Sequence, residues 1–152
     1  MSGFRFSLEK VRHLRQAEEE SRARTVADRR READGARAEE AQLESARDQS
    51  LAQVRSVHGA GGAVGHLQNL EYVLERLDEH IQVVRSRRRE AEEDLVQSID
   101  EYTDALRRRQ AIEKLRERRL ALWKRQQQRL EQAATDEVAL TRHQRGAVGG
   151  ES

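Results

Sequence analysis

Apolar residues recur at alternating steps of three and four along the second half of the chain. The positions visited are Leu67, Leu70, Leu74, Leu77, Ile81, Val84, Arg88, Ala91, Leu95, Ser98 and Tyr102, and all but Arg88 and Ser98 are apolar. A seam that lasts more than three heptads indicates a coiled coil. The stretch from His66 to Arg145 contains neither Pro nor Gly to interrupt a helix. We therefore predict one long helix over residues 67–145.

The first 57 residues carry a weaker helical pattern. Ala, Glu and Arg dominate from Ala17 to Val57, whereas large apolar side chains are sparse. Such a helix is stable only against a partner, and alanines along its thin apolar stripe would let that partner approach closely. Four glycines from Gly59 to Gly65 then favour a break. We predict a single domain with a first helix over residues 1–57, a Gly-rich hinge over 58–66 and, after the second helix, a disordered tail over 146–152.

A short hinge between two long helices favours an antiparallel two-helix coiled coil, which is a long helical hairpin of the all-α class. If the chain folds back near residue 62, the numbers of paired positions add up to about 124, so Phe4 lies near Leu120. The second helix then extends roughly 30 Å beyond the first. We expect the apolar residues of this extension to have no partner inside the chain and to need one outside it: Leu122, Trp123, Leu130, Val138 and Leu140.

Composition agrees with long helices and argues against several other classes. Charged residues make up 38% of the chain and aromatic residues 3%, which leaves too few bulky side chains for a globular core. Without Cys there is no disulfide framework or thiolate site, and no apolar run is long enough for a signal peptide or a membrane span. The arginine clusters at 87–89 and 107–109 lie beside carboxylates, so we expect no nucleic-acid binding.

No combination of residues in the chain indicates catalysis or a cofactor. The glycine-rich segment has Val64 where a dinucleotide fingerprint needs Gly, and it lacks the Lys and Ser or Thr of a phosphate loop. His58 and His66 flank this segment, but two imidazoles without carboxylate or thiolate company make a weak metal site. We expect no enzyme, no catalytic residue, no cofactor and no metal.

Two segments, with their order and spacing, resemble the flagellar export protein FliJ family. The first is Phe4-Arg5-Phe6-Ser7-Leu8-Glu9-Lys10-Val11. The second is Ile112-Glu113-Lys114-Leu115-Arg116-Glu117-Arg118, followed by Asp136-Glu137-Val138-Ala139. The mid-chain glycine break and the restart at Asn69-Leu70-Glu71-Tyr72 belong to the same resemblance, which spans nearly the full length. More distantly, the chain resembles the stalk proteins of injectisome type III secretion.

This resemblance implies an antiparallel coiled coil similar to the central stalk of rotary ATPases. It implies a protein of bacterial flagellum biogenesis and type III secretion, cytoplasmic and held peripherally at the inner face of the cell membrane by its partners. The partners implied are the flagellar export ATPase, the membrane protein of the export gate and export chaperones. Gate contact would fall near the start of the second helix, here at Val73 and Leu77, with His80 and Val84 nearby.

The end of the hairpin away from the glycines combines apolar residues with a row of arginines. Guanidinium groups suit carboxylates that line a protein channel, because they bind in a planar, two-point manner. We therefore expect this end to bind the ATPase ring through Phe4, Phe6, Arg116, Arg118, Arg119, Leu122, Trp123 and Arg125. The alternative function is that of a generic structural coiled coil that dimerises through its seam.

Overall fold

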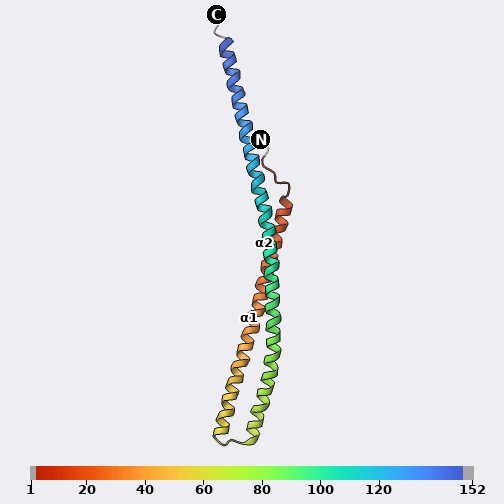
Figure 1. The fold of residues 1–152 in the computed structure, drawn as a ribbon, viewed down its shortest axis with the longest axis vertical. Helices are drawn as coiled ribbons and strands as arrows, with labels where there is room; N and C mark the ends of the chain where they lie inside the picture. The colour runs from red at the N-terminus through yellow and green to blue at the C-terminus, as the bar shows by residue number, and fades with distance from the viewer. Residues whose placement is uncertain (1–2, 149–152) are drawn as a thin grey trace. The chain divides into compact units, whose positions relative to one another are not determined.

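Two long α-helices make up the fold. The computed structural model describes residues 3–148, in which α1 spans Glu9–Gly59 and α2 spans Val64–Val148. None of these residues belongs to a strand. The helices run antiparallel and pack extensively against each other (Figure 1). The predicted all-α helical hairpin is confirmed.

Residues 60–63 connect the helices, and glycine is needed at two of these positions. Gly61 has a φ of +66°, in the left-handed region that favours glycine. The N–H of Gly62 donates to the carbonyl oxygen of Val57 at 3.0 Å, the bond that closes a Schellman motif after a left-handed residue. A Cβ on Gly62 would lie 2.5 Å from Cγ1 of Val57. The chain can therefore cap α1 and reverse within a very short turn.

This connection is shorter than the hinge predicted over residues 58–66. Gly59 ends α1 and Gly65 lies in the first turn of α2, because glycine outside the turn can keep helical angles. At the chain start, residues 3–8 precede α1, which begins only at Glu9. Of the predicted tail, residues 146–148 belong to α2, and residues 149–152 lie outside the described part of the chain.

The chain divides into two compact units, which are described separately. The central unit is Glu18–Leu106 and contains the glycine turn; the terminal unit combines Met1–Ala17 with Arg107–Ser152. Within the central unit, the predicted seam positions Leu70, Ile81, Val84 and Ser98 are buried, as is Ala105 one step further on. All the other seam positions from Leu67 to Tyr102 are half-buried. The seam is therefore the face that α2 turns toward α1.

The facing side of α1 is built from small side chains. Ala33 is fully buried and Ala36 is 4% exposed. Because nothing extends beyond their Cβ atoms, α2 can approach α1 closely at these positions, as predicted from the alanine-rich composition.

A buried carboxylate, Glu40, interrupts this core. Arg85 Nε donates to one of its oxygens at 2.9 Å, and Arg88 Nε donates to the other. Arg88 Nη1 also donates to Glu92 at 3.0 Å, and Arg37 Nε donates to Glu92 at 2.7 Å. The hydrogen bond from Arg85 is the main cause that lowers the pKa of Glu40, and the bond from Arg37 is the main cause that lowers the pKa of Glu92. The buried charge is thus paired and hydrogen-bonded, as burial requires.

Ion pairs across the helices define the register of the central unit. Arg47 Nε lies 2.5 Å from Asp78, and Arg22 Nη1 lies 2.6 Å from Glu101. The residue numbers add up to about 125 for the first pair and about 123 for the second. Both values agree with the register of about 124 expected for a chain that folds back at the glycines.

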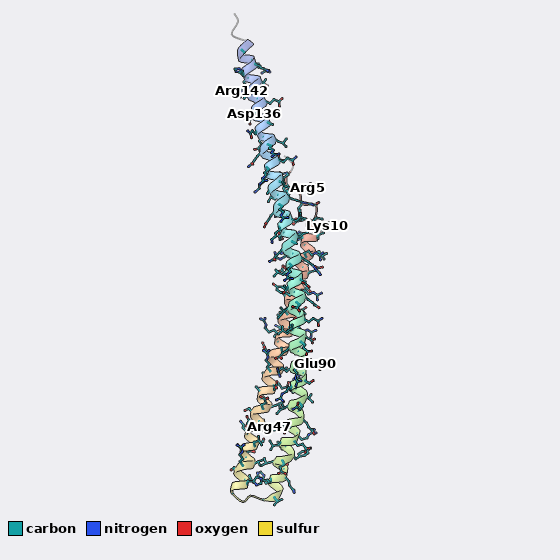
Figure 2. All side chains as sticks on the ribbon, in the orientation of Figure 1. Arg5, Lys10, Arg47, Glu90, Asp136 and Arg142 are labelled. Atoms are coloured by element: carbon teal, nitrogen blue, oxygen red, sulfur yellow. The ribbon has the colours of Figure 1, made fainter. Side chains whose placement is uncertain are left out.

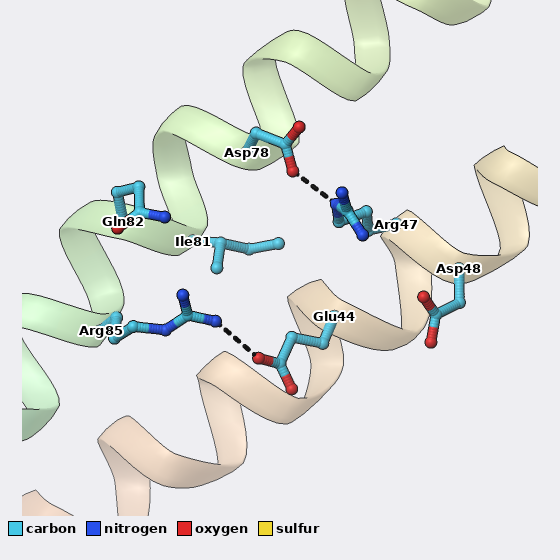
Figure 3. A pocket seen from close by; sticks show the side chains of 7 residues that line it. All are labelled: Glu44, Arg47, Asp48, Asp78, Ile81, Gln82 and Arg85. Atoms are coloured by element: carbon cyan, nitrogen blue, oxygen red, sulfur yellow. Dashed lines mark hydrogen bonds and ion pairs between the residues drawn. The ribbon is translucent and has the colours of Figure 1, made fainter.

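A polar groove of about 450 Å³ lies between two of these cross-helix contacts (Figure 3). Its lining consists of Glu44, Arg47, Asp48, Asp78, Ile81, Gln82 and Arg85. Arg47 pairs with Asp78, and Arg85 pairs with Glu44, so both guanidinium groups of the lining already have carboxylate partners. The groove therefore lies among ion pairs that hold the two helices together, and its arginines are not free to bind a ligand.

Candidate functional site

The terminal unit begins with a short non-helical segment that packs on α2. Phe6 is buried, and the guanidinium carbon of Arg119 lies 5.7 Å from the centre of its ring. Arg119 Nη1 also donates to Ser7 Oγ at 2.7 Å. The Phe4 ring lies 6.1 Å from that of Trp123, at an interplanar angle of 56°. We call residues 4–7 together with Arg119 and Trp123 the N-terminal clasp.

Charged residues hold the first turn of α1 beside the clasp. Arg12 Nε donates to Glu113 at 2.6 Å, and Arg12 Nη1 donates to Glu9 at 2.6 Å. Arg116 Nε lies 3.8 Å from Glu9. The bond from Arg12 is the main cause that lowers the pKa of Glu9, and the bond to Glu113 is the main cause that raises the pKa of Arg12. These contacts dock the start of α1 on α2 in the same register of about 125.

One expectation for this end was wrong. Trp123 was predicted to have no partner inside the chain, yet Phe4 packs against it. The reason is that residues 3–6 are not helical. An extended residue advances about 3.3 Å, whereas a helical residue advances about 1.5 Å. The segment therefore carries Phe4 past Leu120, its expected neighbour, to the next turn of α2.

The eight residues expected to bind the ATPase ring fall into two groups. The residues engaged in contacts within the chain are Phe4, Phe6, Arg116, Arg119 and Trp123. Arg118, Leu122 and Arg125 are exposed instead. Within residues 3–148, neither Arg118 nor Arg125 forms an ion pair or a hydrogen bond. Only this second group is free to meet a partner without loss of a contact within the chain.

From Leu122 onward, four large apolar side chains of α2 are exposed as predicted. The exposed fractions are 62% for Leu122, 57% for Leu130, 52% for Val138 and 63% for Leu140. Figure 2 shows Asp136 and Arg142 on this stretch, where no other described segment of the terminal unit runs beside α2. A single helix with exposed leucines gains stability from a partner.

The residues expected at the export gate lie near the glycine turn. Val73 is 38% exposed and Leu77 is half-buried. Both line a shallow groove of about 570 Å³ on α2, together with Tyr72, Arg76, Glu79, His80 and Val83. Tyr72 and Val83 are more exposed than Val73 and were not predicted. Their spacing of about three helical turns places them on one face of a helix, and this spacing could have identified them from the sequence.

One residue near the expected gate surface must be removed from it. Val84 is only 1% exposed, because it belongs to the seam that faces α1. His80 is exposed and lies 3.8 Å from Glu39. The surface open to a partner on this part of α2 therefore includes His80 and excludes Val84.

His58 and His66 are both exposed. Among residues 3–148, no group of three or more His, Cys, Asp or Glu side chains is arranged to hold a metal ion. Within the same residues, neither helix contains a stretch that is apolar and long enough to cross a membrane.

Comparison with known proteins supplies the family. The family model described as "Flagellar FliJ protein" matches residues 4–147. The match runs from the clasp through both helices and the glycine turn, which is nearly the whole chain. Neither the curated proteins nor the solved structures that were compared contain a match to this chain. The resemblance to this family is thereby confirmed, and this chain belongs to the FliJ family of flagellar export apparatus components.

Proposed function

We propose that the chain acts as a stalk that binds the ring of the flagellar export ATPase with its terminal unit and contacts the membrane export gate through α2 near the glycine turn. The gate contact would hold the protein at the inner face of the cell membrane without any span of its own. Export chaperones are further candidate partners. Membership in the FliJ family supports the setting, and the distribution of exposed side chains supports the assignment of the two contacts.

The proposed ring contact rests on three exposed residues of the terminal unit, which are Arg118, Leu122 and Arg125. Both guanidinium groups lack carboxylate partners within residues 3–148. A guanidinium binds a carboxylate through two parallel hydrogen bonds, which favours contact with acidic side chains lining a ring. Exposed charge pairs contribute modestly in energy, so contacts of this kind would let a stalk bind without being locked in one orientation.

The gate contact rests on the groove that contains Val73 and Leu77. An apolar floor between charged and polar side chains suits a short segment of another protein, because burial of the apolar surface supplies affinity and the rim supplies orientation. Val73 and Tyr72 would provide the exposed apolar area of this contact.

Charge reversal tests the ring contact. The double variant Arg118→Glu/Arg125→Glu changes two exposed residues and leaves the clasp intact. We expect the concentration needed for half-maximal stimulation of the purified export ATPase to rise at least about tenfold, because like charges would then face each other. Circular dichroism should report unchanged helix content.

A matched variant guards against a nonspecific charge effect. Arg107→Glu/Arg108→Glu makes the same change in charge at two exposed positions of α2, nearer its middle. We expect this control to stimulate the ATPase like the natural chain. If the Arg118/Arg125 variant stimulated the ATPase as well as the natural chain, the ring contact at this surface would be refuted. If both variants lost stimulation equally, the loss would be a general effect of charge and would not support a contact at this surface.

Arg119 needs a separate variant because it belongs to the clasp. Arg119→Glu removes the bond to Ser7 and the cation over the Phe6 ring. The chain has a single Trp, so a shift of Trp123 emission to longer wavelength would report that the clasp has opened. Loss of stimulation by Arg119→Glu would therefore reflect the clasp and would not measure a contact with the ring.

The alternative, a structural coiled coil that dimerises through its seam, has less support. Ile81 and Val84 of the seam are buried against α1 within the same chain, so an intermolecular seam would require the hairpin to open. Tight self-association that depends on Ile81 and occurs without the ATPase would favour this alternative.

A further inference from the structure

The last part of α2 carries features that the proposed ring contact does not use. Leu130 and Leu140 are exposed beyond the clasp, and so are Asp136 and Glu137. The acidic pair would meet like charges if this stretch faced the carboxylates proposed for the ring. The apolar and acidic residues after position 129 therefore call for a different partner.

The exposed leucines define one face of this helix. Leu122 and Leu140 are five full turns apart at 3.6 residues per turn, so they lie on the same line along the helix. Ala133 lies about 20° from that line and Leu130 about 80° from it, at 100° per residue. This arrangement gives a sparse apolar stripe over about five turns, with Leu122, Ala133 and Leu140 on its line and Leu130 at its edge.

Charged residues beside the stripe change sign along the helix. Arg125, Arg129 and Asp136 lie about 60°, 20° and 40° to one side of the line, and Glu137 lies about 60° to its other side. Arg129 and Asp136 lie within about 20° of each other around the axis, which places them in one row. The stripe thus has a basic half followed by an acidic half.

We propose that this stripe binds the same stripe of a second copy of the chain in an antiparallel orientation. Positions whose numbers add up to about 262 then face each other. Leu122 lies opposite Leu140 of the second copy, Leu130 lies opposite its Ala133, and Arg125 lies beside its Asp136. Two-fold symmetry repeats each contact, as expected for a pair of identical chains.

Charge complementarity selects this occupant and this orientation. In an antiparallel pair the basic half of one copy meets the acidic half of the other, so Arg125 and Arg129 both lie within about one turn of Asp136 of the second copy. A parallel pair would place Arg125 beside Arg125 and Glu137 beside Glu137, which is unfavourable. Glu131 lies on the opposite side of the helix from Leu122 and stays out of the contact.

The inference goes beyond the proposed function and does not depend on it. Self-association is measured on the isolated chain, without ATPase or gate, so either proposal can fail while the other holds. Because Leu122 and Arg125 belong to both surfaces, pairing of two copies would also compete with binding to the ring. The interface is short, and we expect a weak dimer with a dissociation constant in about the 10 µM to 1 mM range.

Charge-swap variants test the pairing by sedimentation velocity across this range. Arg125→Glu/Arg129→Glu makes both halves of the stripe acidic, and Asp136→Lys/Glu137→Lys makes both halves basic. We expect each variant alone to self-associate at least about tenfold more weakly than the natural chain. An equimolar mixture of the two should regain the dimer, because acidic and basic stripes then face each other along their whole length.

The control is again Arg107→Glu/Arg108→Glu, which lies outside the stripe and should dimerise like the natural chain. A natural chain that is monomeric throughout the range would overturn the proposal. So would a dimer that is unaffected by the charge changes, or a mixture that fails to regain it. Circular dichroism of each variant establishes that its helices are intact.

Orientation is tested by disulfide formation, which is possible because the chain contains no Cys. Leu122→Cys and Leu140→Cys chains are mixed in equal amounts and oxidised gently. We expect the mixed disulfide between the two variants to form faster than either disulfide between identical chains. Predominance of the disulfide between two Leu122→Cys chains would indicate a parallel pair and would overturn the inference.

Discussion

At the scale of single residues, Glu40 is a charged side chain buried within the central unit. Its carboxylate is buried, and its two oxygens accept hydrogen bonds from Arg85 and Arg88. A buried ion pair is costly to break, because it leaves a charge without its partner, yet its replacement by apolar residues is often neutral or stabilising. The pair therefore specifies which parts of the helices meet more than it adds stability.

This interpretation predicts opposite outcomes for single and double substitutions. Glu40→Ala should lower the melting temperature by several degrees, because Arg88 loses the carboxylate that it faces in the core. The double variant Glu40→Leu/Arg88→Leu should recover the melting temperature of the natural chain or exceed it. Thermal unfolding followed by circular dichroism measures both. A double variant less stable than Glu40→Ala would contradict the assignment.

The same carboxylate predicts how stability depends on pH. The pKa of Glu40 is lowered in the folded chain, mainly by the hydrogen bond from Arg85. The folded state therefore binds the proton more weakly than the unfolded state, where the pKa is about 4.3. The stabilisation is fully present above the unfolded value and is lost as pH falls through the folded value.

Glu40→Gln isolates this contribution, because it cannot ionise. We expect the natural chain to melt at a higher temperature than Glu40→Gln at pH 7, and the difference to shrink steadily below about pH 4.3. Melting curves of both chains from pH 7 to pH 2.5 provide the comparison. A difference that stays constant over this range would show that ionisation of Glu40 does not contribute.

At the scale of elements, the seam of α2 should carry the packing energy between the helices. Ile81 is 4% exposed, and truncation of a buried Ile to Ala costs about 2–5 kcal/mol. We expect Ile81→Ala to fall within this range in urea unfolding. Val83, two residues later, is 66% exposed, and Val83→Ala should change stability by no more than about 0.5 kcal/mol. Similar losses at both positions would mean that the seam has been assigned to the wrong face.

The effect of replacing a glycine should also depend on whether it lies within a helix or in the turn. Gly35 lies within α1 with nothing near the position of a Cβ. Gly35→Ala should therefore raise the free energy of unfolding by about 1 kcal/mol through helix propensity. Gly61 has a positive φ, so Gly61→Ala should lower it by about 1–2 kcal/mol. Stabilisation by Gly61→Ala would show that the turn has another conformation in solution.

At the scale of the molecule, the central unit requires residues far apart in sequence to lie side by side. Ala38 and Ser86 are exposed, and their numbers add up to about 124, the register of the hairpin. Spin labels at Ala38→Cys and Ser86→Cys should lie about 15–30 Å apart, given a helix separation of about 8–10 Å plus the length of the labels. A continuous helix would separate them by about 70 Å. A distance near the larger value would contradict the hairpin.

The exposed residues of the candidate site could be predicted from the sequence, whereas the residues of the clasp could not. Arg118, Leu122 and Arg125 are exposed, as a helix that runs beyond its partner requires. The roles of Arg119 and Trp123 in the clasp were not predictable, because they depend on residues 4–7, which have no regular structure. A repeating pattern indicates the face of a helix, but it contains no information on where an irregular segment packs.

The sequence by itself determined that two helices form, which face of the second helix meets the first, and that the chain reverses at the glycines. These features follow from periodicity and backbone freedom, which are local properties of the chain. Only the tertiary structure decided that Phe4 reaches Trp123, that Val84 is closed to a partner, and that Glu40 shares its carboxylate between two arginines. Each of these contacts joins residues distant in sequence through side chains or an extended segment, so their geometry arises only when both helices are in place.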